Sequence, residues 1–233
     1  MNHQHSPKLK VCGLTQPDQI QELIAMNTDF LGFIFYEKSP RYVLNHLTLE
    51  DISKINHQGK TGVFVNEKID KVVEIAEKAR LNIIQLHGDE DSGCIRSLKE
   101  KLPEIQIIKV VRISSVISED KESLLNFKHQ FSGSLHSIQN AIDFILFDTD
   151  SKAFGGTGHA FDWSILQQLE LSKPYFLSGG ISEENINETE TLHPRPFALD
   201  INSKFETEPG HKDISKIKKF MSVLSIESPN GTT

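Results

Sequence analysis

Eight short apolar runs, separated by helical stretches, constrain the fold of this chain more than any other feature of its sequence. Each run is rich in Val, Ile, Leu and Phe and is nearly continuous rather than alternating, which is typical of strands buried on both faces. The runs are KLKVCGL, FLGFIFY, KTGVFVN, NIIQLHG, IQIIKVVRI, DFILFDT, PYFLSGG and FALDIN.

The segments between the runs have the spacing of amphipathic helices. In 67–81 and in 213–224, apolar residues recur every three or four positions, as on the buried face of a helix. Residues suited to a helix start follow the first, sixth and seventh runs: Pro17 and Asp18, then Asp162, then Ser182 with Glu183 and Glu184. Eight strand–helix alternations predict an α/β fold, a single (β/α)8 TIM barrel. An open doubly wound sheet is the alternative, but the first run lacks the GxGxxG turn of a dinucleotide-binding sheet.

Length and composition fit this fold. We expect one barrel domain over residues 1–233, with an ordered core of about 8–224 and short loose tails. The stretch 114–142 is the least regular, and it should hold the fifth helix plus a surface elaboration.

Charge and cysteine usage exclude several classes of protein. A net charge of −7 argues against a general nucleic-acid binder. No apolar stretch approaches the roughly 20 residues of a membrane-spanning helix, and the amino terminus lacks the apolar core of a signal peptide. Two cysteines without a CxxC pair predict free thiols in the cytoplasm, with neither a disulfide scaffold nor a zinc site.

Polar or glycine residues end seven of the eight runs, and strand ends face the active site of such a barrel. These ends are Cys12-Gly13, Asn66, His87-Gly88, Arg112, Asp148-Thr149, Ser178-Gly179-Gly180 and Asp200, while the second run leads into a loop that contains Arg41. Contact with solvent accounts for Asn66 and Thr149 in any barrel. A thiol, an imidazole, two carboxylates and an arginine on one rim favour a functional site.

Cys12 and Asp148 form a candidate acid–base pair. One group would remove a proton from carbon while the other protonates a departing oxygen. Cys12 must then be a thiolate, which requires positive charge or backbone amides that lower the pKa of its thiol. The alternative for Cys12 is a small core residue, whereas an unpaired carboxylate after FILF would be costly to bury. Cys94 lies in a helical stretch and is interpreted as packing.

Two glycine-rich segments suggest contacts with a ligand. Gly179 and Gly180 in SGGIS would let backbone amides approach an anion at a helix start, and a plain tight turn is the alternative. Gly155, Gly156 and Gly158 belong to AFGGTGHAFDW, which suits a lid over a ligand and is not a Walker motif. No second histidine lies at metal-ligand spacing near His87, which favours a polar pocket residue.

The sequence resembles the phosphoribosylanthranilate isomerase family of tryptophan biosynthesis from about Lys10 to Met221. The shared blocks are KVCGLT, GFIFYEKSPRYV, GVFVNE, IQLHGDE, ILFDT with GGTGHAFDW, LSGGISEENI and the ending around EPGHKD. The resemblance implies an Amadori rearrangement of N-(5-phosphoribosyl)anthranilate to 1-(2-carboxyphenylamino)-1-deoxyribulose 5-phosphate. It implies no metal and no organic cofactor.

The resemblance also implies a role for each matching residue. Cys12 would be the general base at C2 of the sugar, and Asp148 the general acid at the furanose ring oxygen. The remaining positions would bind substrate: Arg41 the anthranilate carboxylate, His87 and Asp200 the rest of the molecule, and Gly179, Gly180 and Ser203 the phosphate. Where the family has DVSSGVE this chain reads DINSKFE, so that Lys204 replaces a flexible glycine. Lysine there either supplies a positive charge or accompanies a different course of the loop.

Two other functions are weighed against this one. The sister Amadori isomerase of histidine biosynthesis resembles two fused half-barrels and uses two aspartates, which the cysteine in the first strand and the missing repeat disfavour. A non-catalytic phosphosugar-binding protein should lack Cys12 or Asp148, and both are present. The expected partner is a small phosphosugar, without nucleic acid or membrane, bound by a monomer or a homodimer.

Overall fold

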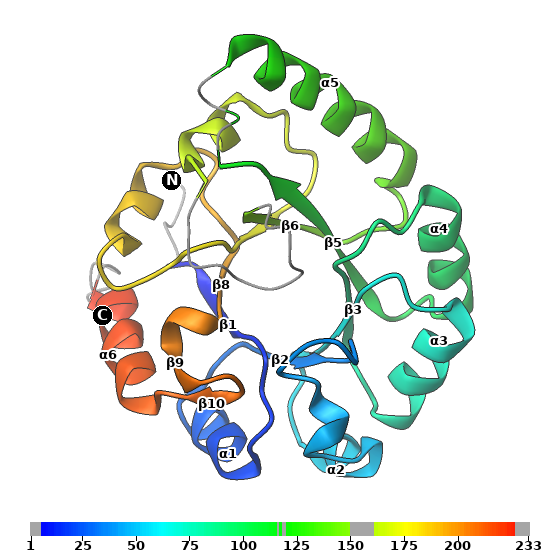
Figure 1. The fold of residues 1–233 in the computed structure, drawn as a ribbon, viewed down its shortest axis with the longest axis vertical. Coiled ribbons are helices and arrows are strands. Elements are labelled where there is room, and N and C mark those ends of the chain that lie inside the picture. The colour runs from blue at the N-terminus through cyan, green and yellow to red at the C-terminus, as the bar shows by residue number, and fades with distance from the viewer. Residues whose placement is uncertain (1–5, 116, 118–119, 150–160, 227–233) are drawn as a thin grey trace, which may run out of the picture.

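The eight predicted strands form a closed parallel barrel in the computed structural model, which describes residues 6–115, 117, 120–149 and 161–226. The strands lie side by side in chain order, and β8 closes on β1 (Figure 1). Their bounds are β1 Lys8–Val11, β2 Phe30–Ile34, β3 Lys60–Phe64, β4 Ile83–Leu86, β5 Gln106–Ile113, β6 Phe144–Thr149, β7 Tyr175–Leu177 and β8 Ala198–Ile201. The prediction of a (β/α)8 barrel is confirmed.

Both faces of the strands are buried, which explains why the runs do not alternate. The outward side chains pack against the helices in one large core, and a separate cluster fills the interior of the barrel. Three rings of this inner cluster meet at its centre: Phe30 and Phe144 lie with ring centroids 5.2 and 5.3 Å from that of Phe176. The barrel is therefore filled by side chains at this end and is open for chemistry only at the other.

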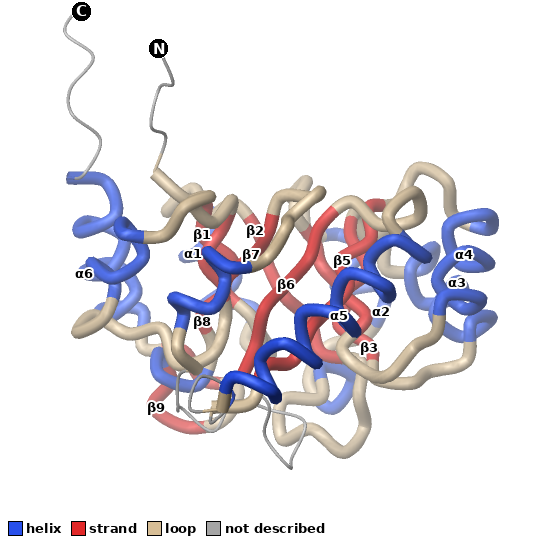
Figure 2. Tube along the Cα trace, turned by 90° about the horizontal axis from the view of Figure 1, so that it is seen from above, coloured by secondary structure: helices blue, strands red, loops and turns tan. Residues whose placement is uncertain are grey.

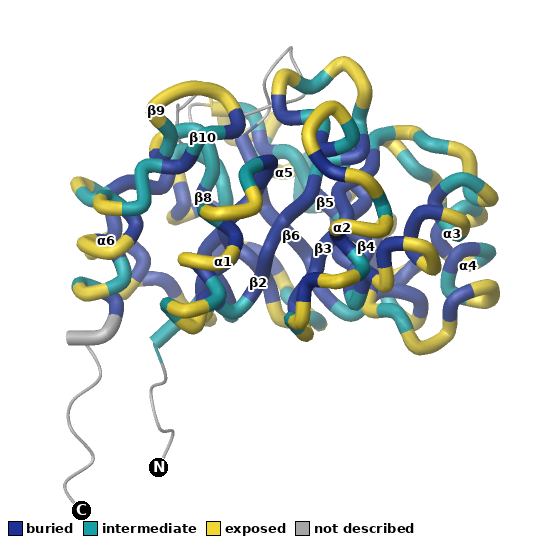
Figure 3. Tube along the Cα trace, turned by 90° about the horizontal axis from the view of Figure 1, so that it is seen from below, coloured by how far each residue is buried: buried dark blue, intermediate teal, exposed yellow. Residues whose placement is uncertain are grey.

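Helices surround the barrel as an outer ring (Figure 2). They are α1 Pro17–Ala25, α2 Leu49–Lys54, α3 Ile69–Lys78, α4 Ser92–Lys101, α5 Lys121–Ile138 and α6 Ile214–Ile226. In Figure 3 the strands and the inward helix faces are buried, and exposure is concentrated on the outer turns. Pro17 is at the first helical position of α1, and Asp18 is in its first turn, as predicted.

Short 3-10 helices follow β6 and β7 where α-helices were predicted: η3 Trp163–Gln168 and η4 Ile186–Thr191. Asp162 does cap its segment, accepting a hydrogen bond from the Ser164 amide, but the helix lasts only six residues. Ser182 starts a turn instead of a helix, because the Asn185 side chain bonds the Gly180 carbonyl and the Ser182 amide. Such local side-chain bonds compete with helical ones.

Three smaller features complete the architecture. The segment 114–142 holds α5, a helix of 18 residues capped by Asp120, so its irregular sequence lengthens the fifth helix. A 3-10 helix, η1 Val43–Asn45, follows the loop after β2. After β8 come η5 Ser203–Phe205 and a hairpin of β9 Glu206–Glu208 with β10 His211–Lys212. The predicted loose ends, 1–5 and 227–233, lie outside the described residues.

Candidate active site

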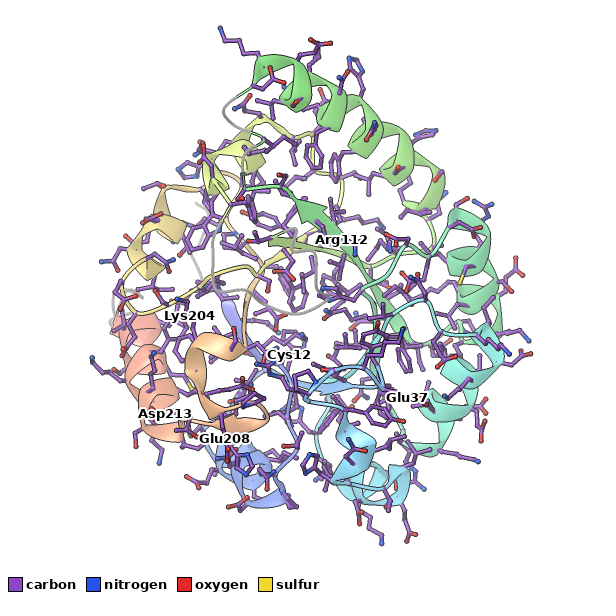
Figure 4. The ribbon with its side chains drawn as sticks, in the orientation of Figure 1. Cys12, Glu37, Arg112, Lys204, Glu208 and Asp213 are labelled. Carbon is purple, nitrogen blue, oxygen red and sulfur yellow. The ribbon has the colours of Figure 1, made fainter. Side chains whose placement is uncertain are left out.

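A pocket at the carboxyl ends of the strands brings together eight of the residues predicted for the site. Figure 4 labels Cys12 at the end of β1 and Lys204 on the segment after β8. The eight are Cys12, Arg41, His87, Asp148, Gly179, Gly180, Asp200 and Ser203, and Lys204 lines the same pocket.

Alternation along the strands explains why these side chains converge. Successive side chains of a strand point to opposite faces, so every second residue of a barrel strand faces the interior. Leu146 belongs to the inner apolar cluster, and Asp148, two residues further along β6, lines the pocket. Ala198 and Asp200 repeat the relation on β8. The pocket is therefore the last layer of the barrel interior, with polar groups in place of apolar ones.

Cys12 lies directly beyond β1 and is 5 % exposed. Its amide bonds the Ile201 carbonyl, which continues the pairing of β1 with β8. The thiol lies over Gly32 of β2, where a Cβ atom would come 2.9 Å from Sγ. Gly13 has a φ of +76°, and a Cβ there would meet Arg41 and Asn202 at 2.7 and 2.8 Å. Both glycines are needed for the thiol to reach its position.

Asp148 is 9 % exposed and lies against His87. The Nε2 atom of His87 is 3.3 Å from the Oδ2 atom of Asp148, and the other carboxylate oxygen accepts the Thr149 amide. Gln85 contacts the remaining ring nitrogen of His87 at 3.0 Å. The carboxyl group is thus held in place by two neighbours, the Thr149 amide at one oxygen and the His87 imidazole at the other.

Beneath the thiol, a buried ion pair joins β1 to β8. The Lys10 Nζ atom lies 2.8 Å from the Asp200 Oδ1 atom, and the Lys10 side chain has no exposure to solvent. Burial, the largest effect, lowers the pKa of the Lys10 ammonium, but Asp200 and Cys12 together outweigh it, and the net pKa is raised. Burial also raises the pKa of the Cys12 thiol, against an opposing effect of the Lys10 and Lys212 ammonium groups.

A second charged cluster contains Arg41, the predicted ligand of a carboxylate. Its Nε and Nη2 atoms donate to both carboxylate oxygens of Glu206, and the Lys212 ammonium lies 2.7 Å from the same carboxylate. Burial raises the pKa of Glu206, but the two cations outweigh it and lower the net pKa. Arg41 therefore lines the pocket with a guanidinium that Glu206 already holds through Nε and Nη2. Among the described contacts, its Nη1 atom makes no hydrogen bond to that carboxylate.

The loop after β7 turns through Gly179 and Gly180, whose φ angles are +80° and +81°. A Cβ atom on Gly179 would lie 2.5 Å from Thr149 Oγ1 and 3.2 Å from Asp148 Oδ1, so this glycine lets the loop pack against the end of β6. Among the described residues, neither of their amides has an acceptor. The predicted helix start is wrong here, and the amides belong to a turn held by Asn185.

Two other predicted positions, Arg112 and Asn66, do not line this pocket. Arg112 pairs with Asp89 and lines a separate cavity beside α4 and α5. The Asn66 side chain accepts the Asp89 amide at 2.7 Å, in keeping with a structural role. The predicted lid residues Gly155, Gly156 and Gly158 lie outside the described residues. In the part of the chain that is described, no group of three or more His, Cys, Asp or Glu residues could hold a metal ion.

The sequence did not predict four residues that line the pocket or bond to residues lining it: Lys10, Gln85, Glu206 and Lys212. Lys10 carried a usable signal, since a lysine inside an apolar run has to find a buried partner. Gln85 carried a weaker one, because it interrupts NIIQLHG two residues before His87. Glu206 and Lys212 lie in a polar segment whose burial only the hairpin β9–β10 creates.

The family model described as "N-(5'phosphoribosyl)anthranilate (PRA) isomerase" matches residues 9–223. A protein of Parabacteroides distasonis with the name N-(5'-phosphoribosyl)anthranilate isomerase is 37 % identical over 216 residues, which cover 91 % of each chain.

Two solved structures are similar to the whole barrel. One is a phosphoribosyl anthranilate isomerase in complex with reduced 1-(o-carboxyphenylamino)-1-deoxyribulose 5-phosphate, with a TM-score of 0.68 and 30 % identity. The other is described as monomers of the dimeric isomerase from Thermotoga maritima and has the same TM-score and identity. Each similarity covers 94 % of this chain and 98 % of the other.

Proposed function

This chain belongs to the N-(5'-phosphoribosyl)anthranilate isomerase family, and from that premise we propose that Cys12 and Asp148 are its catalytic base and acid. The reaction is the isomerisation of N-(5'-phosphoribosyl)anthranilate to 1-(2-carboxyphenylamino)-1-deoxyribulose 5-phosphate in tryptophan biosynthesis. One observation carries the assignment: a thiol and a carboxyl group, from β1 and β6, line one pocket together with the loops after β7 and β8.

The acid step belongs to Asp148. A proton moves from its carboxyl group to the ring oxygen of the ribose, the bond between that oxygen and C1 breaks, and the anthranilate nitrogen forms a double bond to C1. His87 supports this step as a positioning residue, since its Nε2 atom fixes the carboxyl group at 3.3 Å. Positioned acids of this kind contribute about 10²–10⁴-fold to a rate.

The base step belongs to Cys12. Its thiolate takes the proton from C2, the electrons of that C–H bond form a C1–C2 double bond, and the nitrogen recovers its electron pair. The enol then becomes the ketone of the product by a proton shift to C1. The small exposure of the thiol, 5 %, keeps bulk water away from the abstracted proton.

The two anionic ends of the substrate fit the two sides of the pocket. We assign the phosphate to the side formed by Gly179, Gly180 and Ser203, because the amides of the two glycines have no acceptor within the part of the chain that the structure describes. We assign the anthranilate carboxylate to Arg41, which lines the pocket and whose Cδ methylene lies beside Gly13. Asp200, below Cys12, lies under the sugar.

The test follows the loss of fluorescence of freshly generated phosphoribosylanthranilate with wild-type protein, Cys12→Ser and Asp148→Asn. We expect each substitution to lower kcat/KM by about 10²–10⁴-fold. Cys94→Ser and Asp89→Asn are matched controls, because neither residue lines this pocket, and both should keep wild-type activity. Full activity in Cys12→Ser or Asp148→Asn would overturn the assignment, and binding of a reduced product without turnover by the wild type would indicate a binding protein.

We also propose that the enzyme works in the cytoplasm as a monomer or a homodimer. Its two cysteines are free, which fits a reducing cytoplasm. None of the helices in the described residues is long and apolar enough to cross a membrane. Light scattering of the purified chain would distinguish a monomer from a homodimer, both of which the relative from Thermotoga maritima makes reasonable.

A further inference from the structure

The buried pair of Lys10 and Asp200 lies where the barrel interior changes from apolar to polar. Lys10 is fully buried, Asp200 is 7 % exposed, and their Cα atoms are direct partners in the ladder between β1 and β8. Removing two charges from water costs as much as or more than their attraction returns, so stability is a weak reason for such a pair. The position of the pair therefore calls for another explanation.

That position is directly beneath Cys12. Lys10 and Cys12 are two residues apart on one strand, so their side chains share the inner face of the barrel. The ammonium group is held by Asp200 at 2.8 Å, and its charge acts to lower the pKa of the Cys12 thiol. Gly32 of the neighbouring strand has no side chain and so leaves room for the thiol here, since a Cβ atom on Gly32 would lie 2.9 Å from Sγ.

The charged residues around the thiol come from five segments of the fold. They are Lys10 from β1, Asp200 from β8, Lys212 from β10, and Arg41 from the loop after β2 with its partner Glu206 from β9. His87 and Asp148 also act on the pKa of Asp200, in opposite directions. With all five ionised, three cations and two anions leave one net positive charge, which favours a thiolate at Cys12 over a thiol.

We propose that Lys10 is a positioning residue that promotes the ionisation of Cys12 to the thiolate needed for proton abstraction, against the effect of burial, and that Asp200 limits this effect by pairing with Lys10. The inference rests on the function proposed for Cys12. Burial alone would keep the thiol protonated, and the ammonium groups of Lys10 and Lys212 oppose burial, whereas the carboxylate of Asp200 acts in the same direction as burial. The two members of this ion pair should thus shift the pKa of the Cys12 thiol in opposite directions.

The test measures the rate of alkylation of Cys12 by iodoacetamide against pH, with Cys94→Ser as the background so that one thiol reacts. We expect Lys10→Met to move the midpoint of this profile upward, and Asp200→Asn to move it downward, each by about one unit or more, which is a tenfold change in thiolate. Lys10→Arg keeps the charge and should stay near the parent midpoint. A variant with both Lys10→Met and Asp200→Asn removes the pair as a whole and should fall between the two.

The control for loss of a buried lysine is Lys60→Met. Lys60 on β3 is 4 % exposed and donates to the carbonyls of Ile52 and Ala79, with no contact to the thiol. Its loss should destabilise the fold and leave the midpoint unchanged. If Lys10→Met folds poorly, Asp200→Asn and Lys10→Arg still test the proposal. Midpoints that stay within a few tenths of a unit, or that move in the same direction, would overturn it.

Alkylation needs no turnover, so it separates this inference from the proposed function. Opposite midpoint shifts in an inactive protein would support the control of Cys12 and overturn only the proposed reaction. In an active protein, the pH profile of kcat/KM should rise at the same midpoint as alkylation, and its rise should move with Lys10→Met and Asp200→Asn. If the pH profile of kcat/KM were the same in both variants as in the wild type, Lys10 would have no role in the reaction.

Discussion

Lys204 adds a positive charge to this pocket on the side where we propose that the phosphate binds. It lies in η5, lines the pocket with Ser203, and is exposed. Its ammonium group has no carboxylate partner among the described residues, whereas Arg41 is already paired with Glu206. The sequence left two interpretations of Lys204, a positive charge for the ligand or a different course of the loop. Because Lys204 lines the pocket, its position favours the first.

We expect Lys204→Ala to raise KM for the phosphoribosyl substrate by about tenfold or more, with little change in kcat, since a charged hydrogen bond contributes roughly 1.5–3 kcal/mol. Steady-state kinetics at two salt concentrations would measure this, and the salt dependence of KM should weaken in the variant. Lys204→Arg should retain most of the affinity. Lys218→Ala on α6, whose lysine pairs with Glu22 outside the pocket, is the matched control. An unchanged KM in Lys204→Ala would mean that the lysine does not contact the phosphate.

Single residues divide into those that the sequence could identify and those that it could not. Cys12, His87 and Asp148 could be predicted because each directly follows or ends an apolar run, where a barrel opens to its site. The partner of Lys10 could not, because Asp200 lies 190 positions away in the chain and only closure of the barrel brings the two together. Long-range pairs of this kind have no local signature.

At the scale of elements, one buried carboxylate is the charged link between the hairpin β9–β10 and the barrel mouth, beside hydrogen bonds from Thr15 and Gln19. Glu206 at the start of β9 accepts from Arg41 in the loop after β2 and from Lys212 in β10, and its side chain is 3 % exposed. The two cations lower its pKa in the folded protein. This carboxylate therefore contributes stability that is present above the unfolded value of about 4.3 and is lost as pH falls through the lower folded value.

We expect Glu206→Gln to lower the free energy of unfolding at pH 7 by about 3–5 kcal/mol, because two buried cations lose their partner. Urea unfolding at a series of pH values from 7 downward would measure it, and the difference from wild type should shrink below about pH 4.3. Glu208→Gln in the same strand is the control, since that side chain is 68 % exposed, and its effect should be small. A difference that is constant with pH would show that the carboxylate charge is not responsible.

The strands were predicted more reliably than the connections between them, for a physical reason. A strand buried on both faces is apolar at most positions, and all eight runs follow this rule with few polar exceptions, such as Lys10 and Gln85. The connections after β6 and β7 only have to cover the barrel, and short 3-10 helices do so where Asn185 and Thr189 bond nearby backbone carbonyls instead of extending a helix. Helix type in such a short segment is decided by its contacts, not by its periodicity.

At the scale of the whole molecule, the barrel separates stability from chemistry along its axis. The inner apolar cluster fills the end at which the strands begin, and Lys8 lies over the rings of Phe30 and Phe197 at 5.6 and 5.4 Å. The charged layer with Lys10 follows, and the pocket forms the last layer. Substitutions in the first layer should therefore change the stability of the barrel without changing its acid–base groups.

Phe176 tests this separation, since it is fully buried on β7 and its ring contacts those of Phe30, Phe144 and Phe197. We expect Phe176→Ala to lower the free energy of unfolding by about 3–5 kcal/mol because it leaves a cavity inside the barrel. Unfolding in urea can be followed by the fluorescence of Trp163, the single tryptophan, which is 5 % exposed. At a temperature where the variant stays folded, kcat and KM should be those of the wild type.

Leu125→Ala on α5 is the control for this prediction, because Leu125 is 55 % exposed and its removal should change neither stability nor activity. Phe176→Leu, which keeps most of the volume, should recover a large part of the lost stability. If Phe176→Ala instead lowered kcat in fully folded protein, packing at the closed end of the barrel would affect the geometry of the pocket. The two layers would then be coupled through Lys10 and Asp200, which lie between them. The alkylation profile of Cys12 in Phe176→Ala would then identify that coupling, because the midpoint moves only if the ion pair beneath the thiol has moved.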